Sequence, residues 1–163
     1  MQQTEATNLI KGAITTQQPQ KWADLGCGSG TFTIALQSLL PTGSQVTAVD
    51  KQRQNLPVNF IKADFEKDEL NLSGLDGILM ANSLHYIRDK QKLVKKLEAY
   101  FASRPTFLIV EYDTTRFSPW VPYPINYQKL EQFFVTVGYT AITKLDEMPS
   151  RFGGRMYSAV VGL

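Results

Sequence analysis

The sequence predicts an α/β fold: a doubly wound, seven-stranded, mostly parallel sheet with one antiparallel strand near the edge. Short apolar segments alternate with amphipathic segments, which is typical of parallel strands joined by crossover helices. Phe, Leu, Ile and Val occur in a row within residues 106–110, as expected of a strand buried on both faces. The last two predicted strands are joined by a short connection through Pro149 and Gly153-Gly154. With no helix between them, these two strands should pair antiparallel.

Four segments are expected to be helical. The first two, residues 4–15 and 31–40, carry apolar residues at three- and four-residue intervals. Asp89 and Asn126 are each placed to cap a further helix, and Gly138 closes the last one.

The expected strands are apolar or β-branched segments of five to seven residues. They cover residues 21–25, 45–50, 58–63, 77–81, 106–110, 140–145 and 155–161. No repeat, low-complexity tract or linker interrupts them, so a single domain is expected over residues 1–163.

Composition limits the classes of function. The chain has 163 residues, of which 43% are hydrophobic, so it can bury a substantial core. A net charge of +2 is too small to indicate nucleic-acid binding. One cysteine, Cys27, and one histidine, His85, argue against a disulfide or a metal site. No apolar run is long enough for a membrane span and no signal peptide is recognisable, so we expect a cytoplasmic protein.

A glycine-rich turn follows the first strand and precedes the second helix, with the sequence Asp24-Leu25-Gly26-Cys27-Gly28-Ser29-Gly30. Glycines at this spacing let the backbone fold tightly and approach a ligand closely. The helix N-terminus offers free N–H groups, and the acidic residue can neutralise a cationic ligand. The turn therefore predicts a nucleotide-like cofactor.

Polar residues gather where the predicted strands end. Besides the glycine turn, they are Asp50, Asp64, Asn82–His85, Glu111–Asp113, Arg151 and Arg155. Ligands of open α/β sheets bind at the carboxyl ends of the strands. We therefore expect the functional site at this edge of the sheet.

With these residues the chain resembles the class I S-adenosylmethionine-dependent methyltransferases, in particular small, single-domain members of the type 11/12 kind. Asp24-x-Gly26-x-Gly28-x-Gly30 matches the first motif of that family, and residues 76–89 resemble its fourth-strand motif. The resemblance extends from about Trp22 to the end of the chain. It implies a Rossmann-like fold, S-adenosylmethionine as cofactor and methyl transfer as the reaction, with no metal required.

The resemblance also implies a set of cofactor-binding residues. Asp50 would hold the ribose hydroxyls, Asp64 would accept a hydrogen bond from the adenine amine, and Phe65 would cover the adenine ring. The full set is Asp24, Gly26, Cys27, Gly28, Gly30, Asp50, Lys51, Asp64, Phe65, Ala81 and Asn82. In one departure from the family, only residues 51–57 separate the second and third strands, so the helix usual there should be reduced to a turn.

The acceptor of the methyl group is expected near the fourth and fifth strands. His85 is the candidate base because an imidazole can take a proton near neutral pH, although a purely structural role is equally open. Glu111 and Asp113 are the alternatives. The candidate acceptor pocket comprises His85, Tyr112, Trp120, Tyr123, Tyr127, Arg151 and Arg155. If either arginine points inward, an anionic acceptor such as a carboxylate is favoured.

The chain has no room for the added recognition domain typical of methyltransferases that act on polymers, so the expected acceptor is a small molecule. Helix 4–15 would form a partial lid, completed by residues 113–125 or by a second subunit in a homodimer. Two alternatives stay open. A catalytically inactive cofactor-binding module would be favoured if Trp120 or Tyr123 blocked the acceptor channel. A nicotinamide-dependent oxidoreductase would need Gly-x-Gly-x-x-Gly, in which Thr31 would be the third glycine.

Overall fold

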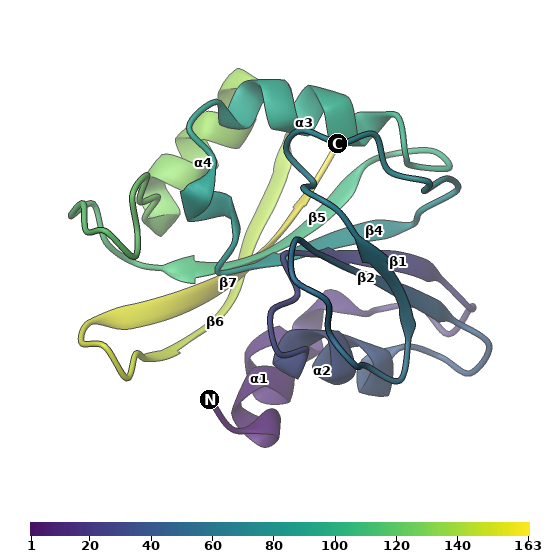
Figure 1. Cartoon of the computed structure of the whole chain (residues 1–163). Helices are drawn as coiled ribbons and strands as arrows, with labels where there is room; N and C mark the ends of the chain where they lie inside the picture. Colours follow the sequence, from purple (N-terminus) through teal and green to yellow (C-terminus); the bar gives the residue numbers. More distant parts are fainter.

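A seven-stranded sheet organises the chain, and the computed structural model describes residues 1–163 (Figure 1). The strands are β1 (Lys21–Leu25), β2 (Gln45–Asp50), β3 (Asn59–Lys62), β4 (Gly77–Ala81), β5 (Thr106–Tyr112), β6 (Ala141–Pro149) and β7 (Arg155–Gly162). Their order in the sheet is β3-β2-β1-β4-β5-β7-β6. Pairing is parallel from β3 to β5, and β7 pairs antiparallel with both β5 and β6. The predicted fold, with one reversed strand near the edge, is therefore confirmed.

The chain reverses its direction of winding at the centre of the sheet. From β1 it moves outward to β2 and β3, then returns to place β4 on the other side of β1. The carboxyl ends of β1 and β4 thus form a topological switch point, where open α/β sheets bind ligands. The glycine turn follows β1, and Asn82 follows β4.

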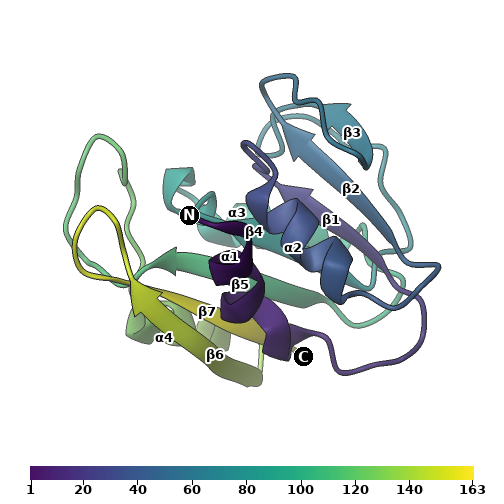
Figure 2. The same ribbon diagram turned by 90° about the horizontal axis from the view of Figure 1, so that it is seen from below.

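Helices cover both faces of the sheet, as Figures 1 and 2 show from two directions. One face carries α1 (Gln3–Ile10), followed by a 3-10 turn at Lys11–Ala13, and α2 (Thr31–Leu39). The other carries α3 (Lys90–Glu98) and α4 (Tyr127–Thr136). A short 3-10 helix, η2 (Leu84–Tyr86), lies between β4 and α3.

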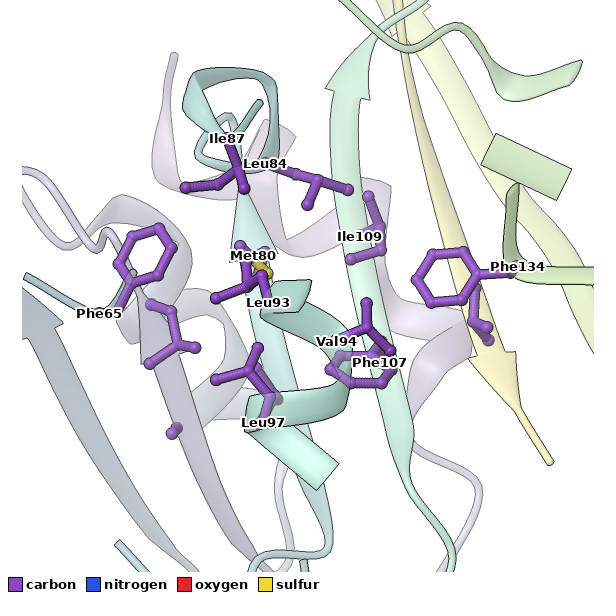
Figure 3. Close-up of a cluster of buried hydrophobic side chains, with 14 of the residues drawn as sticks. Phe65, Met80, Leu84, Ile87, Leu93, Val94, Leu97, Phe107, Ile109 and Phe134 are labelled. Atoms are coloured by element: carbon purple, nitrogen blue, oxygen red, sulfur yellow. The ribbon is translucent and has the colours of Figure 1, made fainter. Parts of the chain in front are cut away.

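The alternation of side chains along each strand divides the core into two layers. In β5, Phe107 and Ile109 pack beneath α3 and α4 with Phe134 (Figure 3), whereas Leu108 and Val110 join the layer under α1 and α2. Every one of these side chains is almost fully buried. The apolar run that predicts β5 is therefore explained by burial on both faces.

The predicted helix caps are present. The Asp89 carboxylate accepts a hydrogen bond from the Lys92 N–H at 3.0 Å, and the Asn126 side chain accepts one from Lys129 at 3.0 Å. No helix forms between β2 and β3, as the short connection predicts. The predicted first helix is too long, because the α-helix ends at Ile10, two residues before Gly12, and continues only as the 3-10 turn.

None of the helices has the length and apolar character that a membrane crossing requires.

Candidate functional site

A cavity of about 720 Å³ opens at the carboxyl ends of the strands. This volume is in the range of small-molecule binding sites. Its walls come from the glycine turn, the ends of β2, β4 and β5, the connection between β6 and β7, and the N-terminal part of α1.

The glycine turn adopts backbone angles that favour glycine. Gly26 has a φ of +79°, and a Cβ at this position would lie 2.6 Å from the Cβ of Ser83. The close approach of the turn to the segment after β4 therefore requires glycine. Gly28 has a φ of +51°, and a Cβ there would meet no atom within 4 Å, so its bare backbone faces open space on the cavity wall. Such a backbone is free to contact a ligand.

Asp24 lines the cavity, and only one of its two carboxylate oxygens has a hydrogen-bond partner. Its Oδ2 accepts a hydrogen bond from the Thr33 hydroxyl at 2.6 Å, while its buried Oδ1 has no partner. Burial raises the pKa of Asp24 to about 7, with a further contribution from Asp50 and an opposing one from the Thr33 hydrogen bond. A cationic group near Oδ1 would pair with this carboxylate and compensate for its burial.

Asp50 is fixed at the end of β2 by two backbone groups. Its Oδ2 accepts a hydrogen bond from the Gly28 N–H and its Oδ1 accepts one from the Gln52 N–H, both at 2.9 Å. Each carboxylate oxygen can accept more than one hydrogen bond. Asp50 therefore retains acceptor capacity towards hydroxyl groups in the cavity.

The next part of the wall is formed by Lys51, Asp64 and Phe65. The Lys51 ammonium lies 3.1 Å from Asp64 Oδ2, and Asp64 Oδ1 accepts a hydrogen bond from the Glu66 N–H at 3.0 Å. Partial burial acts to raise the pKa of Asp64, but these hydrogen bonds outweigh it and lower the pKa. Phe65 is buried and also contributes to the core layer under α3.

Asn82 follows β4 in an unusual conformation. Its φ of +53° makes it the one residue other than glycine with a positive φ, and its buried Oδ1 has no hydrogen-bond partner. Strained backbone and unpartnered polar atoms both concentrate at ligand sites. Asn82 and Asp24 thus place two unsatisfied oxygens at the switch point between β4 and β1.

Cys27 lines the cavity but is not suited to act as a nucleophile. Burial raises the pKa of its thiol to about 12, and the nearby carboxylates of Asp24 and Asp50 contribute. The thiolate is the reactive form of cysteine, and here the thiol stays protonated.

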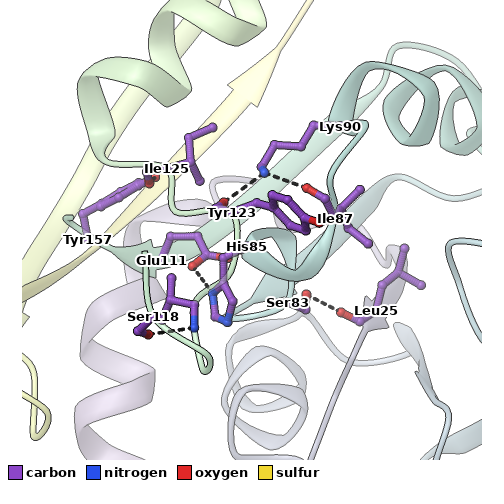
Figure 4. A network of polar contacts seen from close by, with 11 residues as sticks. Leu25, Ser83, His85, Ile87, Lys90, Glu111, Ser118, Tyr123, Ile125 and Tyr157 are labelled. Carbon is purple, nitrogen blue, oxygen red and sulfur yellow. Dashed lines mark hydrogen bonds and ion pairs between the residues drawn. The ribbon is translucent and has the colours of Figure 1, made fainter. Parts of the chain in front are cut away.

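His85 and Glu111 form a buried pair behind the cavity (Figure 4). His85 Nδ1 lies 2.7 Å from Glu111 Oε2, and the backbone N–H of His85 donates to Glu111 Oε1 at 3.0 Å. His85 does not line the cavity; its ring lies 4.3 Å from that of Tyr86 and 5.8 Å from that of Tyr112, which both do. Both oxygens of Glu111 are engaged by His85, so this carboxylate orients the imidazole.

The predicted cofactor residues come together in the structure. All of them except Gly30 line the cavity. Gly30 is instead the N-cap of α2, where a Cβ would lie 2.4 Å from the side chain of Leu56. Its φ of +84° and this close contact together explain the glycine.

Only two of the seven predicted acceptor residues line the cavity. Tyr112 and Arg151 line the cavity, whereas His85, Trp120, Tyr123, Tyr127 and Arg155 do not. Trp120 is 79% exposed, and Tyr123 is 40% exposed, so neither fills the cavity. Arg155 pairs with Glu147 at 2.9 Å, and Asp113 accepts a hydrogen bond from the Tyr127 N–H at 3.0 Å.

Several cavity residues are not predicted from the sequence. They include Met1, Glu5, Tyr86, Met148, Phe152 and Met156. Tyr86 and Phe152 directly follow His85 and Arg151 in the sequence. An aromatic residue beside a predicted site residue could have indicated that they belong to the cavity. The methionines and Glu5 carry no such signal, since their orientation depends on how β6, β7 and α1 pack.

Comparison with known families gives one match over most of the chain. A family model described as "Methyltransferase domain" matches residues 3–147. A search of curated protein sequences gave no match.

Solved structures share the fold at low sequence identity. A SAM-dependent methyltransferase from Archaeoglobus fulgidus has a TM-score of 0.72 and 14% identity, with 99% of this chain and 95% of that chain covered. The 1,6-didemethyltoxoflavin-N1-methyltransferase of Burkholderia thailandensis, solved with its namesake compound and S-adenosylhomocysteine, has a TM-score of 0.71 and 17% identity, covering 98% and 76%.

Some similar structures are much longer. The CurJ carbon methyltransferase has a TM-score of 0.73 and 13% identity, and the alignment covers 96% of this chain but 53% of that one. The chain likewise covers 56% of a similar protein from Nostoc punctiforme. It thus spans about half the length of these two structures.

Proposed function

This chain belongs to the class I S-adenosylmethionine-dependent methyltransferase family, and from that premise we propose that it transfers a methyl group from S-adenosylmethionine to a small-molecule acceptor. The family match, together with the SAM-dependent methyltransferases among the similar structures, confirms the predicted cofactor, S-adenosylmethionine. The observation that carries the proposal is the buried, unpartnered Oδ1 of Asp24 on the wall of the cavity, beside the glycine turn.

The cavity wall fits the chemical groups of this cofactor. Asp24 Oδ1 is available to accept a hydrogen bond from the ammonium group, and the Asp50 carboxylate is available to the two ribose hydroxyls. The bare backbone of Gly28 leaves room for close contact, and Phe65 offers an apolar face to the adenine. Asp64 Oδ2 is paired with the Lys51 ammonium, so a hydrogen bond from the adenine amine would use the remaining acceptor capacity of the Asp64 carboxylate.

When bound, S-adenosylmethionine supplies a methyl group on a sulfonium, whose sulfur keeps the C–S bonding electrons as the acceptor's lone pair forms the new bond to carbon. The protein's share of catalysis is then mainly alignment and exclusion of water, and alignment can contribute roughly 7–11 kcal/mol. Met1 and Glu5 of the N-terminal segment line the cavity, which supports a role for α1 as a partial lid.

His85 is the proposed base for an acceptor that must lose a proton. With Nδ1 on Glu111, the imidazole is held with its proton at Nδ1 and its lone pair at Nε2. His85 does not line the cavity itself, but its ring packs against those of Tyr86 and Tyr112, which do. In this scheme the acceptor proton is relayed to Nε2 through an intervening group such as a water molecule. Glu111 acts as a positioning residue in this scheme.

Titration calorimetry with S-adenosylhomocysteine tests cofactor binding, and NAD⁺ is the control ligand for the oxidoreductase alternative. We expect saturable, one-to-one binding of S-adenosylhomocysteine and none of NAD⁺; the reverse result would refute the proposal. Incubation with methyl-labelled S-adenosylmethionine and a fractionated metabolite extract then tests catalysis. Labelled small-molecule product is expected, and binding without any transfer would favour the inactive-module alternative.

A further inference from the structure

The part of the cavity formed by η2, the end of β5 and the connection between β6 and β7 differs in character from the part that contains Asp24, Asp50 and Asp64. Its wall includes Glu5, Tyr86, Tyr112, Met148, Arg151, Phe152 and Met156. Aromatic and methionine side chains predominate here. On the proposed function, this part receives the acceptor, and its chemistry therefore bears on what the acceptor is.

Aromatic rings form a row along this wall. The rings of Tyr112 and Phe152 meet edge to face, with centroids 6.4 Å apart and an interplanar angle of 77°. The buried ring of His85, which does not itself line the cavity, connects Tyr112 to Tyr86, with centroid distances of 5.8 and 4.3 Å. Rings in such a row present faces and edges to which a further flat ring can pack favourably.

The chain leaves part of this aromatic surface uncovered. Phe152 is 87% exposed, and Tyr86 is 53% exposed, although both line the cavity. Exposed apolar surface around a concave site is typical of a ligand-binding surface. Met148 and Met156 complete the wall, and methionine adapts readily to the shape of an aromatic ligand.

Arg151 provides an unpaired positive charge in the same part of the cavity. Two basic side chains line the cavity, Lys51 and Arg151; Lys51 pairs with Asp64 at 3.1 Å, and Arg151 forms no ion pair. The acidic residue in this wall, Glu5, already accepts a hydrogen bond from the Gln2 N–H at 2.7 Å. A planar guanidinium is well suited to bind a carboxylate through two parallel hydrogen bonds.

We propose that the acceptor is a planar aromatic compound that carries a carboxylate. Tyr86, Tyr112 and Phe152 contact its ring, and Arg151 binds its carboxylate. The methylated group is then a hydroxyl or amine elsewhere on the ring, directed towards the glycine turn.

The test uses three probe acids in the presence of saturating S-adenosylhomocysteine: 4-hydroxybenzoate, 3,4-dihydroxybenzoate and 6-hydroxy-2-naphthoate. Each is compared by titration calorimetry with its neutral amide, which has the same shape. We expect at least one acid to bind, about tenfold more tightly than its amide, because a charge-assisted pair replaces a neutral hydrogen bond. Arg151→Met should abolish this preference.

Arg155→Met is the matched control, since Arg155 begins β7 directly after the connection that carries Arg151, but pairs with Glu147 and does not line the cavity. It should keep the preference for the acid. The inference is overturned if no acid binds more tightly than its amide, or if Arg151→Met retains the difference. Binding of S-adenosylhomocysteine is measured first in the same samples, so its absence would count against the proposed function, and its presence without acid preference against this inference alone.

Discussion

Thr33 donates a hydrogen bond to Asp24 Oδ2 at 2.6 Å, and the other oxygen of this buried carboxylate has no partner. Thr33 lies in the first turn of α2, and Asp24 lies near the end of β1, so the contact joins the two elements on either side of the glycine turn. Oδ2 thus helps to hold the turn in place, and Oδ1 is left for a ligand.

The unligated protein should lose stability as the pH rises, because Asp24 is costly to ionise. Its pKa is raised to about 7, whereas an aspartate in the unfolded chain titrates near ~3.9. Between these values the folded state binds more protons than the unfolded state, so the free energy of unfolding falls with rising pH. Asp24→Asn should be more stable than the wild type at pH 8 by about 2–4 kcal/mol, and this gain should shrink at pH 5. Urea unfolding at the two pH values measures it, and a variant less stable than wild type at pH 8 would contradict the assignment.

Asp50 and His85 should differ sharply in their importance for cofactor binding. Asp50 lines the cavity and its carboxylate is fixed by backbone N–H groups, whereas His85 lies behind the wall. Asp50→Ala should weaken S-adenosylhomocysteine binding roughly 100-fold, since hydrogen bonds to a charged group are lost. His85→Ala should leave the affinity within about threefold, because it breaks no expected contact to the cofactor. Calorimetry on both variants decides the matter, and equal affinities would refute this division of roles.

Much of the fold is predictable from the sequence, because strand ends coincide with changes in composition. β1, β2 and β4 begin and end at the predicted residues, since each apolar run is bounded by polar or glycine residues. β6 extends to Pro149, four residues beyond the prediction, because its pairing with β7 continues past the apolar segment.

The cofactor half of the site is similarly predictable, and the acceptor half is not. Asp24, Asp50 and Asn82 occur directly at or after strand ends, so the topology alone brings them together. Trp120 and Tyr123 lie in a segment without regular structure, where no periodicity indicates the direction of a side chain. Their exposure depends on packing that the sequence does not reveal.

Gly77 should tolerate no larger residue, because it lies against a buried indole. A Cβ at Gly77 would come within 2.4 Å of the ring of Trp22, which is almost fully buried. Gly77→Ala should therefore reduce the free energy of unfolding by about 1–3 kcal/mol through overpacking. Gly162→Ala is the control, since the nearest atom to its Cβ would be the Ala141 Cβ at 4.0 Å. Urea unfolding compares the two, and equal stabilities would show that Trp22 can move aside at little cost.

Glu111→Gln should separate the orienting role of Glu111 from cofactor binding. The amide has one oxygen in place of two, so it cannot accept hydrogen bonds from both the backbone N–H and Nδ1–H of His85 in the present arrangement. With the imidazole misoriented, kcat should fall on the order of 100-fold, the usual contribution of a positioned base. The affinity for S-adenosylhomocysteine should stay unchanged, since Glu111 does not line the cavity. Methyl transfer to the acceptor found in the metabolite screen measures kcat across pH 5–9, with His85→Gln as the parallel variant. If both variants keep wild-type kcat and its pH profile, the pair serves only to hold η2 against β5.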